Sequence, residues 1–133
     1  MSVQRFEPSD PREWLNRARS NLERSVLKSP HTYLEDLCFD AQQAAEKAIK
    51  AVLLHRGVDF PYIHDLDKLI GLLAGSGIEI PTAVQDAGKL TRYAVVNRYP
   101  GFSAEVTQTE HQRAVAIATA VVDWAGSVVG YPS

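Results

Sequence analysis

The stretch CFDAQQAAEKAIKAVLLHRG, residues 38–57, holds five alanines within eleven positions and no glycine or proline before its last residue. Alanine is the strongest helix former, and its small side chain lets neighbouring helices approach closely. From Leu34 to Leu53, apolar residues recur at three- and four-residue steps, which is the period of a helix that buries one broad face. We therefore predict a central helix over about residues 31–56, ended by Gly57, with other helices packed against it.

The residues before this stretch predict where the first two helices begin. Asp10 can accept a hydrogen bond from the first helical turn, and Pro11 suits the first helical position. With the apolar period that follows them, these two residues predict a helix over about residues 11–28. Ser29 and Pro30 repeat the order of cap and proline, and we expect them to start the central helix.

Three more helices are predicted after the central one. A short amphipathic helix covers about residues 65–73 and is closed by glycines. A longer helix, about 81–98, opens at a proline and ends before Pro100, which disfavours helical geometry at the residue preceding it. Thr107 and Glu110 match a capping box, in which each side chain bonds the other's backbone amide, and a helix rich in Ala and Val follows to about Val129.

These elements predict the fold class and the number of domains. No segment shows the alternating period of a half-buried strand, so we expect an all-α fold: an up-and-down bundle of four long helices plus one short helix. At 133 residues the chain has the length of one domain, residues 1–133, with a core over about 11–127.

Composition excludes several kinds of protein. The formal charge of −2 argues against a basic surface that coats nucleic acid. One cysteine and four scattered histidines predict neither a disulfide framework nor a metal site, and we expect no cofactor. No signal core and no run of about eighteen apolar residues is present, so we expect a cytoplasmic protein with no membrane partner.

Some residues of the central and last helices carry expectations of their own. Glu46 and Lys50 lie one turn apart and should pair on the outside of the central helix. At least one of the glutamines at positions 42 and 43 should be exposed. His111, in the first turn of the last helix, should be solvated, and Cys38 should be a small core residue rather than a reactive thiol.

The central block, together with two later motifs, resembles the HEPN family of prokaryotic helical domains. The block contains FDAQQAAEKAIKAVL, an alanine-rich helix of the kind that recurs in that family, and it is followed by Pro61, then His64-Asp65-Leu66, then Arg98-Tyr99-Pro100. These motifs occur in the family in the same order. The resemblance covers about residues 11–127, which is nearly the whole chain.

The resemblance implies a helical bundle that forms a homodimer. Relatives are often encoded beside a minimal nucleotidyltransferase, as a two-component module of the toxin–antitoxin type. Many relatives are metal-independent endoribonucleases whose active site forms where two protomers meet, and which use an Arg and a His separated by four to six residues. The resemblance therefore implies a dimer, a co-encoded nucleotidyltransferase as partner, and contact with RNA or a nucleotide.

The stretch LTRYAVVNRYPG, residues 90–101, carries the candidate functional residues. Metal-free cleavage of RNA needs a proton acceptor, a proton donor and a cation that stabilises the phosphoryl charge. Arg92 and Arg98 can supply the cation, but Asn97 stands where one common form of the family motif has its histidine. Because asparagine cannot shuttle a proton near neutral pH, the proton acceptor would have to be His64 or Tyr99. We therefore predict weak or absent ribonuclease activity.

Three interpretations of this stretch remain open. Its arginines and tyrosines can simply stack to hold the end of a helix. They can form a polar groove that binds a nucleotide or single-stranded RNA without cleavage, in which cations meet phosphate and tyrosines stack on a base; the residues for this role are Lys89, Arg92, Tyr93, Asn97, Arg98 and Tyr99. The protein can also be an active metal-independent endoribonuclease that uses Arg92 or Arg98 with His64 or Tyr99.

Overall fold

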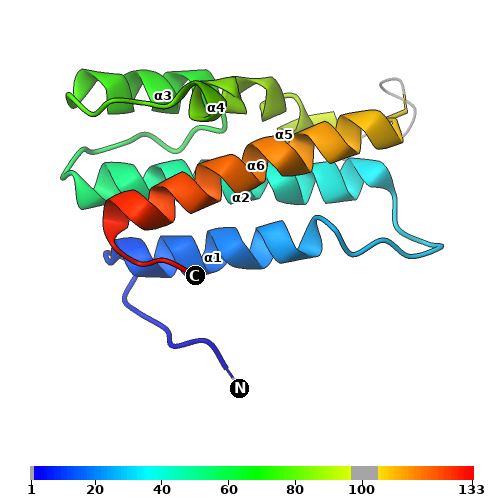
Figure 1. Ribbon diagram of the computed structural model, residues 1–133, viewed down its shortest axis with the longest axis horizontal. Coiled ribbons are helices and arrows are strands. Elements are labelled where there is room, and N and C mark those ends of the chain that lie inside the picture. The colour runs from blue at the N-terminus through cyan, green and yellow to red at the C-terminus, as the bar shows by residue number, and fades with distance from the viewer. Residues whose placement is uncertain (1, 97–104) are drawn as a thin grey trace.

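The computed structural model describes residues 2–96 and 105–133, and every regular element within these residues is helical. The all-α prediction is confirmed. The elements are α1 (Pro11–Arg24), α2 (Leu34–His55), α3 (Leu66–Gly75), α4 (Thr82–Gln85), the 3₁₀ helix η1 (Asp86–Leu90), α5 (Tyr93–Val96) and α6 (Gln108–Val129) (Figure 1). Among the described residues, no helix combines the length and the hydropathy of a membrane-spanning segment.

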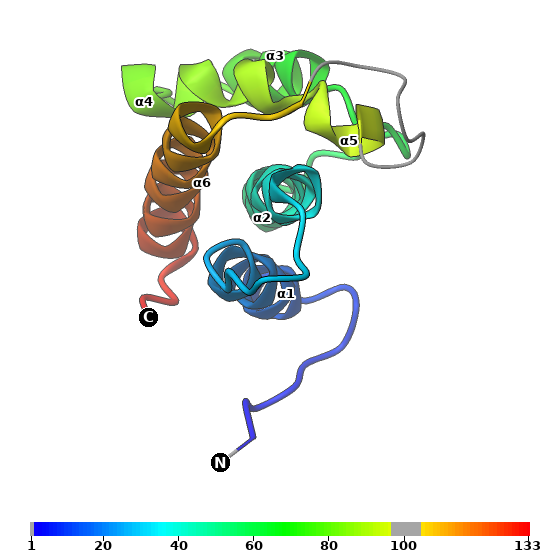
Figure 2. The ribbon, with the colours of Figure 1, turned by 90° about the vertical axis from the view of Figure 1, so that its right-hand side faces the viewer.

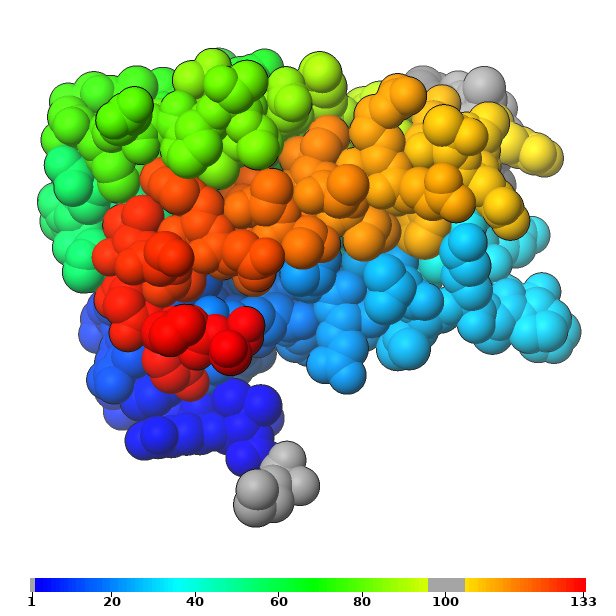
Figure 3. All heavy atoms as spheres, in the orientation of Figure 1, coloured from blue at the N-terminus to red at the C-terminus, as the bar shows by residue number. Residues whose placement is uncertain are grey.

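Helix α2 is the centre of the bundle. Figure 2 shows it nearly end-on, with α1 on one side, α6 on a second and the layer of α3 to α5 on a third. Its five alanines are fully buried: Ala41, Ala44, Ala45, Ala48 and Ala51. These small side chains allow the surrounding helices to approach the α2 backbone closely, and the larger residues of the neighbours fill the space. Helix α6 lies across one face of the molecule, between α1 and α4 (Figure 3).

Helix α1 begins as the sequence predicts and ends earlier. The Asp10 side chain accepts a hydrogen bond from the Arg12 amide at 2.9 Å, and Pro11 is the first helical residue. The helix stops at Arg24, and Ser25 caps it: the Ser25 amide donates to Asn21 O and Leu22 O, and the Ser25 hydroxyl donates to Leu22 O at 2.6 Å. The predicted extension to residue 28 is wrong, and the apolar side chains there are exposed.

Helix α2 does not begin at Ser29 and Pro30. The hydroxyl of Thr32 donates to Ser29 O at 3.0 Å and accepts from the Ser29 amide at 2.9 Å, which closes a turn before the helix. Leu34 is instead the first helical residue, and Tyr33 precedes it without a side-chain cap. The other end agrees with the prediction, since Gly57 adopts a positive φ of 71° just after the helix, a conformation that glycine adopts without strain.

The helix predicted over residues 81–98 is interrupted: within the described part it becomes α4, η1 and α5. Gly88 lies against the carboxylate of Asp67, where a β-carbon would collide. The Thr91 hydroxyl accepts a hydrogen bond from the Leu66 amide at 3.1 Å, at the start of α3. We attribute the interruption to these contacts with α3, together with the low helix propensity of glycine.

Helix α6 confirms the predicted capping box. The Glu110 amide donates to Thr107 Oγ1 at 3.1 Å, and the Thr107 amide donates to Glu110 Oε2 at 3.3 Å. The helix ends at Val129, and Gly130 follows with a positive φ of 78°. Both ends of α6 are therefore fixed by residues that are local in the sequence.

Replacing Ala45 by leucine tests the close packing around α2. The added side chain has no free space between fully buried neighbours, so we expect Ala45→Leu to lower the free energy of unfolding by about 1–3 kcal/mol. Ala116 is an exposed alanine in another long helix, and Ala116→Leu should change stability by less than about 0.5 kcal/mol. Urea denaturation of both variants measures the difference; equal stability of the two would contradict the packing described here.

Candidate functional site

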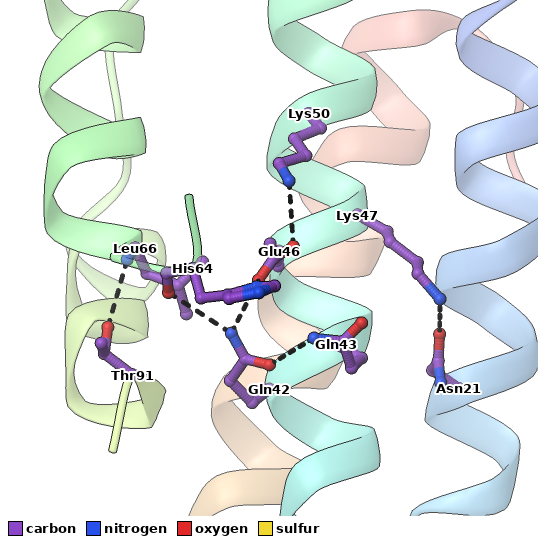
Figure 4. Close-up of polar contacts among 9 residues, drawn as sticks. All are labelled: Asn21, Gln42, Gln43, Glu46, Lys47, Lys50, His64, Leu66 and Thr91. Carbon is purple, nitrogen blue, oxygen red and sulfur yellow. Dashed lines mark hydrogen bonds and ion pairs between the residues drawn. The ribbon is translucent and has the colours of Figure 1, made fainter. Parts of the chain in front are cut away.

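A buried carboxylate, Glu46, joins α2 to the loop that precedes α3. Its side chain receives three hydrogen bonds: from Gln42 Nε2 at 2.9 Å, from Lys50 Nζ at 3.0 Å and from His64 Nδ1 at 2.8 Å (Figure 4). The predicted pairing of Glu46 with Lys50 is correct, but its predicted place on the outside is wrong. The two residues are only 4% and 5% exposed, because neighbouring elements cover α2 at this point.

Glu46 remains charged despite its burial. Burial alone would raise the pKa of its carboxyl group, but the hydrogen bonds from Gln42, His64 and Lys50 outweigh that effect and leave the pKa below its ordinary value. The Lys50 ammonium lies 6.0 Å from the ring centre of Trp14 and 5.6 Å from that of Phe60, where the electron-rich faces of the rings stabilise a cation. Carboxylate and ammonium thus compensate each other inside the protein.

A second polar cluster joins α1 to α2. Asn21 donates to Asp40 Oδ1 at 2.9 Å and accepts from Lys47 Nζ at 2.7 Å. Burial lowers the pKa of Lys47 below that of a lysine in water. Of the two glutamines, Gln42 is fully buried and is satisfied by Glu46, whereas Gln43 is half-buried; the expected solvent exposure of one glutamine is therefore only partial.

His64 holds the start of α3 in place. Its Nδ1 is bonded to Glu46, while Asp65 caps α3 by accepting from the amides of Asp67 and Lys68 at 3.1 and 3.3 Å. The next residue, Leu66, donates its amide to Thr91 Oγ1 (Figure 4). A chain of contacts therefore runs from Glu46 through this turn to the residue before Arg92.

A pocket with a cationic rim lies between residues 89–93 and the first half of α6. It has a volume of about 180 Å³. Its polar residues are Lys89, Arg92, Tyr93, Glu110 and Arg113, and its apolar residues are Leu90, Ala114 and Ile117. Three basic side chains thus face one acidic side chain, so the side chains that line the pocket have a net positive charge. The chain as a whole carries a charge of −2.

The basic residues of this pocket are only loosely engaged by acidic neighbours. Arg92 Nη1 lies 3.9 Å from Glu110 Oε1, and Lys89 Nζ lies 3.4 Å from Asp86 Oδ1. The Arg92 guanidinium covers the ring of Tyr93, with 4.7 Å between its central carbon and the ring centre. Burial raises the pKa of the Tyr93 hydroxyl, so this group is a neutral donor rather than a base at ordinary pH.

A second pocket, beside the N-terminal segment, suits an anion less well. Its volume is about 260 Å³, and its lining includes Trp14, Arg17 and Lys47. Arg17 Nε already bonds Glu13 at 2.7 Å, and Lys47 Nζ bonds Asn21 at 2.7 Å. Because both of its cations are engaged at short distances, we take the pocket between η1, α5 and α6 as the candidate site.

The structure brings together part of the predicted set. Lys89, Arg92 and Tyr93 line the pocket. His64 does not line it, and its ring faces Glu46 instead. The remaining predicted residues, Asn97, Arg98 and Tyr99, lie outside the described residues. The assigned roles of all six binding candidates and of His64 remain predictions.

Sequence reasoning missed two residues of the pocket. It gave no role to Arg113 and only a capping role to Glu110. Both come from α6, and no local pattern signals that they lie opposite Arg92; only the packing of α6 against α4 and η1 does so.

Two other expectations have clear outcomes. His111 is 3% exposed rather than solvated, and its Nε2 donates to Ser25 O at 2.6 Å, because the start of α6 packs over the end of α1.

Cys38 is fully buried, as expected, and burial raises the pKa of its thiol to about 12, so it is not a reactive thiolate. In the described residues, no group of three His, Cys, Asp or Glu side chains is arranged to hold a metal ion.

Comparisons with known proteins identify the fold. The family model described as HEPN domain matches residues 11–128. The crystal structure of TT1696 from Thermus thermophilus is 28% identical in sequence, with a TM-score of 0.73 over 89% of this chain and 97% of that one. The crystal structure of ST0689, described as an archaeal HEPN homologue, is 23% identical, with a TM-score of 0.69 over 90% of this chain and 98% of that one, and shows the shared fold. No curated protein matches the chain significantly.

Glu46→Gln tests the buried charge pair. The substitution leaves the Lys50 ammonium buried without a counterion, so we expect a loss of about 3 kcal/mol in the free energy of unfolding at pH 7. Because the pKa of Glu46 is lowered in the folded state, its stabilisation is complete above about pH 4.5, the ordinary carboxyl pKa, and disappears as the pH falls through the lower folded pKa. The difference between wild type and Glu46→Gln should therefore narrow below pH 4.5.

The measurement is urea denaturation of both proteins between pH 7 and pH 3. Glu23→Gln, which changes an exposed carboxylate of α1, is the control and should have little effect. A Glu46→Gln variant as stable as wild type at pH 7 would contradict the role of the pair.

Proposed function

The chain belongs to the HEPN domain family, and on that premise we propose that it is a dimeric, RNA- or nucleotide-binding partner of a minimal nucleotidyltransferase in a module of the toxin–antitoxin type. We propose further that its own ribonuclease activity is weak or absent. The observation that carries the binding part of this proposal is the pocket in which Lys89, Arg92 and Arg113 converge beside Tyr93.

The chemistry of the pocket favours a phosphate ligand. Arginine presents paired N–H donors that match phosphate oxygens, and lysine adds a point charge. The plane of the Arg92 guanidinium, which covers Tyr93, is also a surface on which a base can stack. Cations, a stacking plane and an apolar floor together suit a nucleotide, or one nucleotide of a single strand.

The identity of Asn97 and the bonding of His64 support weak or absent cleavage. A ribonuclease without metal needs a group that accepts the proton of the 2′-hydroxyl. Asn97 stands where the resemblance places a histidine, and an amide cannot accept and return a proton near neutral pH. His64 is tied through Nδ1 to Glu46 and is not part of the pocket lining.

One observation favours the alternative of an active metal-independent endoribonuclease. The bond between the Leu66 amide and Thr91 Oγ1 holds the turn that contains His64 beside the segment that contains Arg92, and the His64 side chain is 56% exposed. In this alternative Arg92 or Arg98 stabilises the phosphoryl charge, and His64 or Tyr99 moves the proton. A nucleotide-binding module without any catalytic role is the other alternative.

Substitution of Arg92 separates binding from catalysis. We expect the wild-type protein to bind a labelled single-stranded RNA and to leave it intact between pH 6 and pH 9 without metal. Arg92→Ala removes a phosphate contact, so it should weaken binding about tenfold. It should also reduce the slope of the logarithm of the affinity against the logarithm of the salt concentration by about one. Lys68→Ala, which removes an exposed lysine of α3, is the control and should bind as wild type does.

Fluorescence anisotropy measures the binding, and gel electrophoresis of the RNA measures the cleavage. Cleavage by wild type that is lost in a folded Arg92→Ala variant would replace this proposal by the endoribonuclease alternative. Unchanged affinity in Arg92→Ala would remove the pocket as the binding site.

The assembly is tested separately. We expect a dimer in light scattering after gel filtration, and co-purification with a nucleotidyltransferase that is encoded next to the protein. A monomer that does not retain the transferase would contradict the proposed module while leaving the ligand-binding proposal standing.

A further inference from the structure

Glu110 is an acidic residue inside a pocket whose other charged residues are basic. Its two carboxylate oxygens have different surroundings. Oε2 accepts from the Thr107 amide at 3.3 Å, as part of the capping box. Oε1 accepts no hydrogen bond from the described residues, and Arg92 Nη1 lies 3.9 Å away, beyond hydrogen-bond distance.

The capping box alone does not require a carboxylate at this position. Glutamine fulfils the same capping role, and a negative charge opposes the binding of an anion in the pocket. The carboxylate therefore weakens phosphate binding unless it contacts a donor on the ligand. A carboxylate is a strong acceptor for hydroxyl groups, and ribose hydroxyls bond to acidic side chains in this way in dinucleotide sites.

The pocket is too small to enclose a complete nucleotide, so only part of such a ligand can lie inside it. Its volume of about 180 Å³ is below the roughly 300–1,000 Å³ of pockets that enclose a complete small ligand. Arg113 makes no hydrogen bond or ion pair with the described residues, and its exposed side chain lines the pocket. It is free to hold a phosphate together with Arg92, while the adjacent Glu110 lies within reach of the sugar attached to that phosphate.

We propose that Glu110 accepts a hydrogen bond from the ribose 2′-hydroxyl, so that this pocket selects ribonucleotides over deoxyribonucleotides while Arg92, Arg113 and Lys89 hold the phosphate. This inference rests on the proposed binding function and adds a specificity-determining residue to it. The shared ligand chemistry is a ribose phosphate, present both in a free nucleotide and in RNA.

Paired ligands that differ only in the 2′-hydroxyl test the inference. The pairs are ATP with 2′-deoxyATP, measured by calorimetry, and an RNA ten-mer with the uracil-containing DNA ten-mer of the same sequence, measured by anisotropy. We expect wild type to prefer the ribose form at least about tenfold, the effect of one hydrogen bond to a charged group. The pair that binds distinguishes a free nucleotide from RNA as the source of the ribose phosphate.

Three variants locate the selectivity. Glu110→Gln keeps the capping box, so its melting temperature should stay close to that of wild type, and it should bind both members of a pair with nearly equal affinity. Asp86→Asn removes the acid beside Lys89 without touching the pocket lining; it should bind both forms somewhat more tightly at an unchanged ratio. Arg113→Ala should weaken both forms by the same factor of about ten.

The outcomes separate the inference from the function on which it rests. Equal affinity of wild type for both members of a pair would overturn the role of Glu110 and leave the binding function standing, as would a preference that persists in Glu110→Gln. Failure of wild type to bind any of the four ligands would overturn both.

Discussion

The arrangement of this protein depends on the hydrogen bonds made by one buried carboxylate, that of Glu46. Its neighbours in α2 are alanines that let other helices pack closely, and the same close packing removes water from Glu46 and Lys50. A charge in that position is tolerated only if it is paired and hydrogen-bonded. Glu46 meets this condition by binding Lys50 on its own helix and His64 on the following loop. The requirement that a buried carboxylate be hydrogen-bonded thereby fixes the loop to α2 through His64.

The consequences of this attachment extend to the candidate site. His64 fixes the turn that starts α3, and Leu66 in that turn bonds Thr91, so the segment that carries Arg92 is positioned by α3 and faces α6. The two charged regions differ in their exposure to water. At Glu46 the charges are compensated and buried, whereas in the pocket the cations are exposed and only loosely paired. The first region supports the fold, and the second is available for a ligand.

A feature can be predicted from the sequence when the residues that cause it are close together in the chain. The start of α1 at Pro11 was predicted because the cap and the proline are adjacent in the sequence. The burial of Glu46 and Lys50 was not, because a Glu–Lys pair one turn apart has the same pattern on an exposed helix and on a buried one. The interruption of the predicted helix depends on the contact of Thr91 with α3, and the pocket depends on the position of Arg113 in α6. Both are tertiary contacts between residues that are far apart in the sequence. The sequence points to the basic and aromatic residues around position 92 because they cluster within a few positions.

We propose that this protein binds RNA or a nucleotide in the pocket between η1, α5 and α6. Backbone amide resonances measured during titration with a single-stranded RNA test it most directly. We expect the largest shifts on residues 89–93 and 110–117, with small shifts on α1. Shifts concentrated on the N-terminal pocket, around Trp14 and Lys47, or no shifts at all, would contradict it.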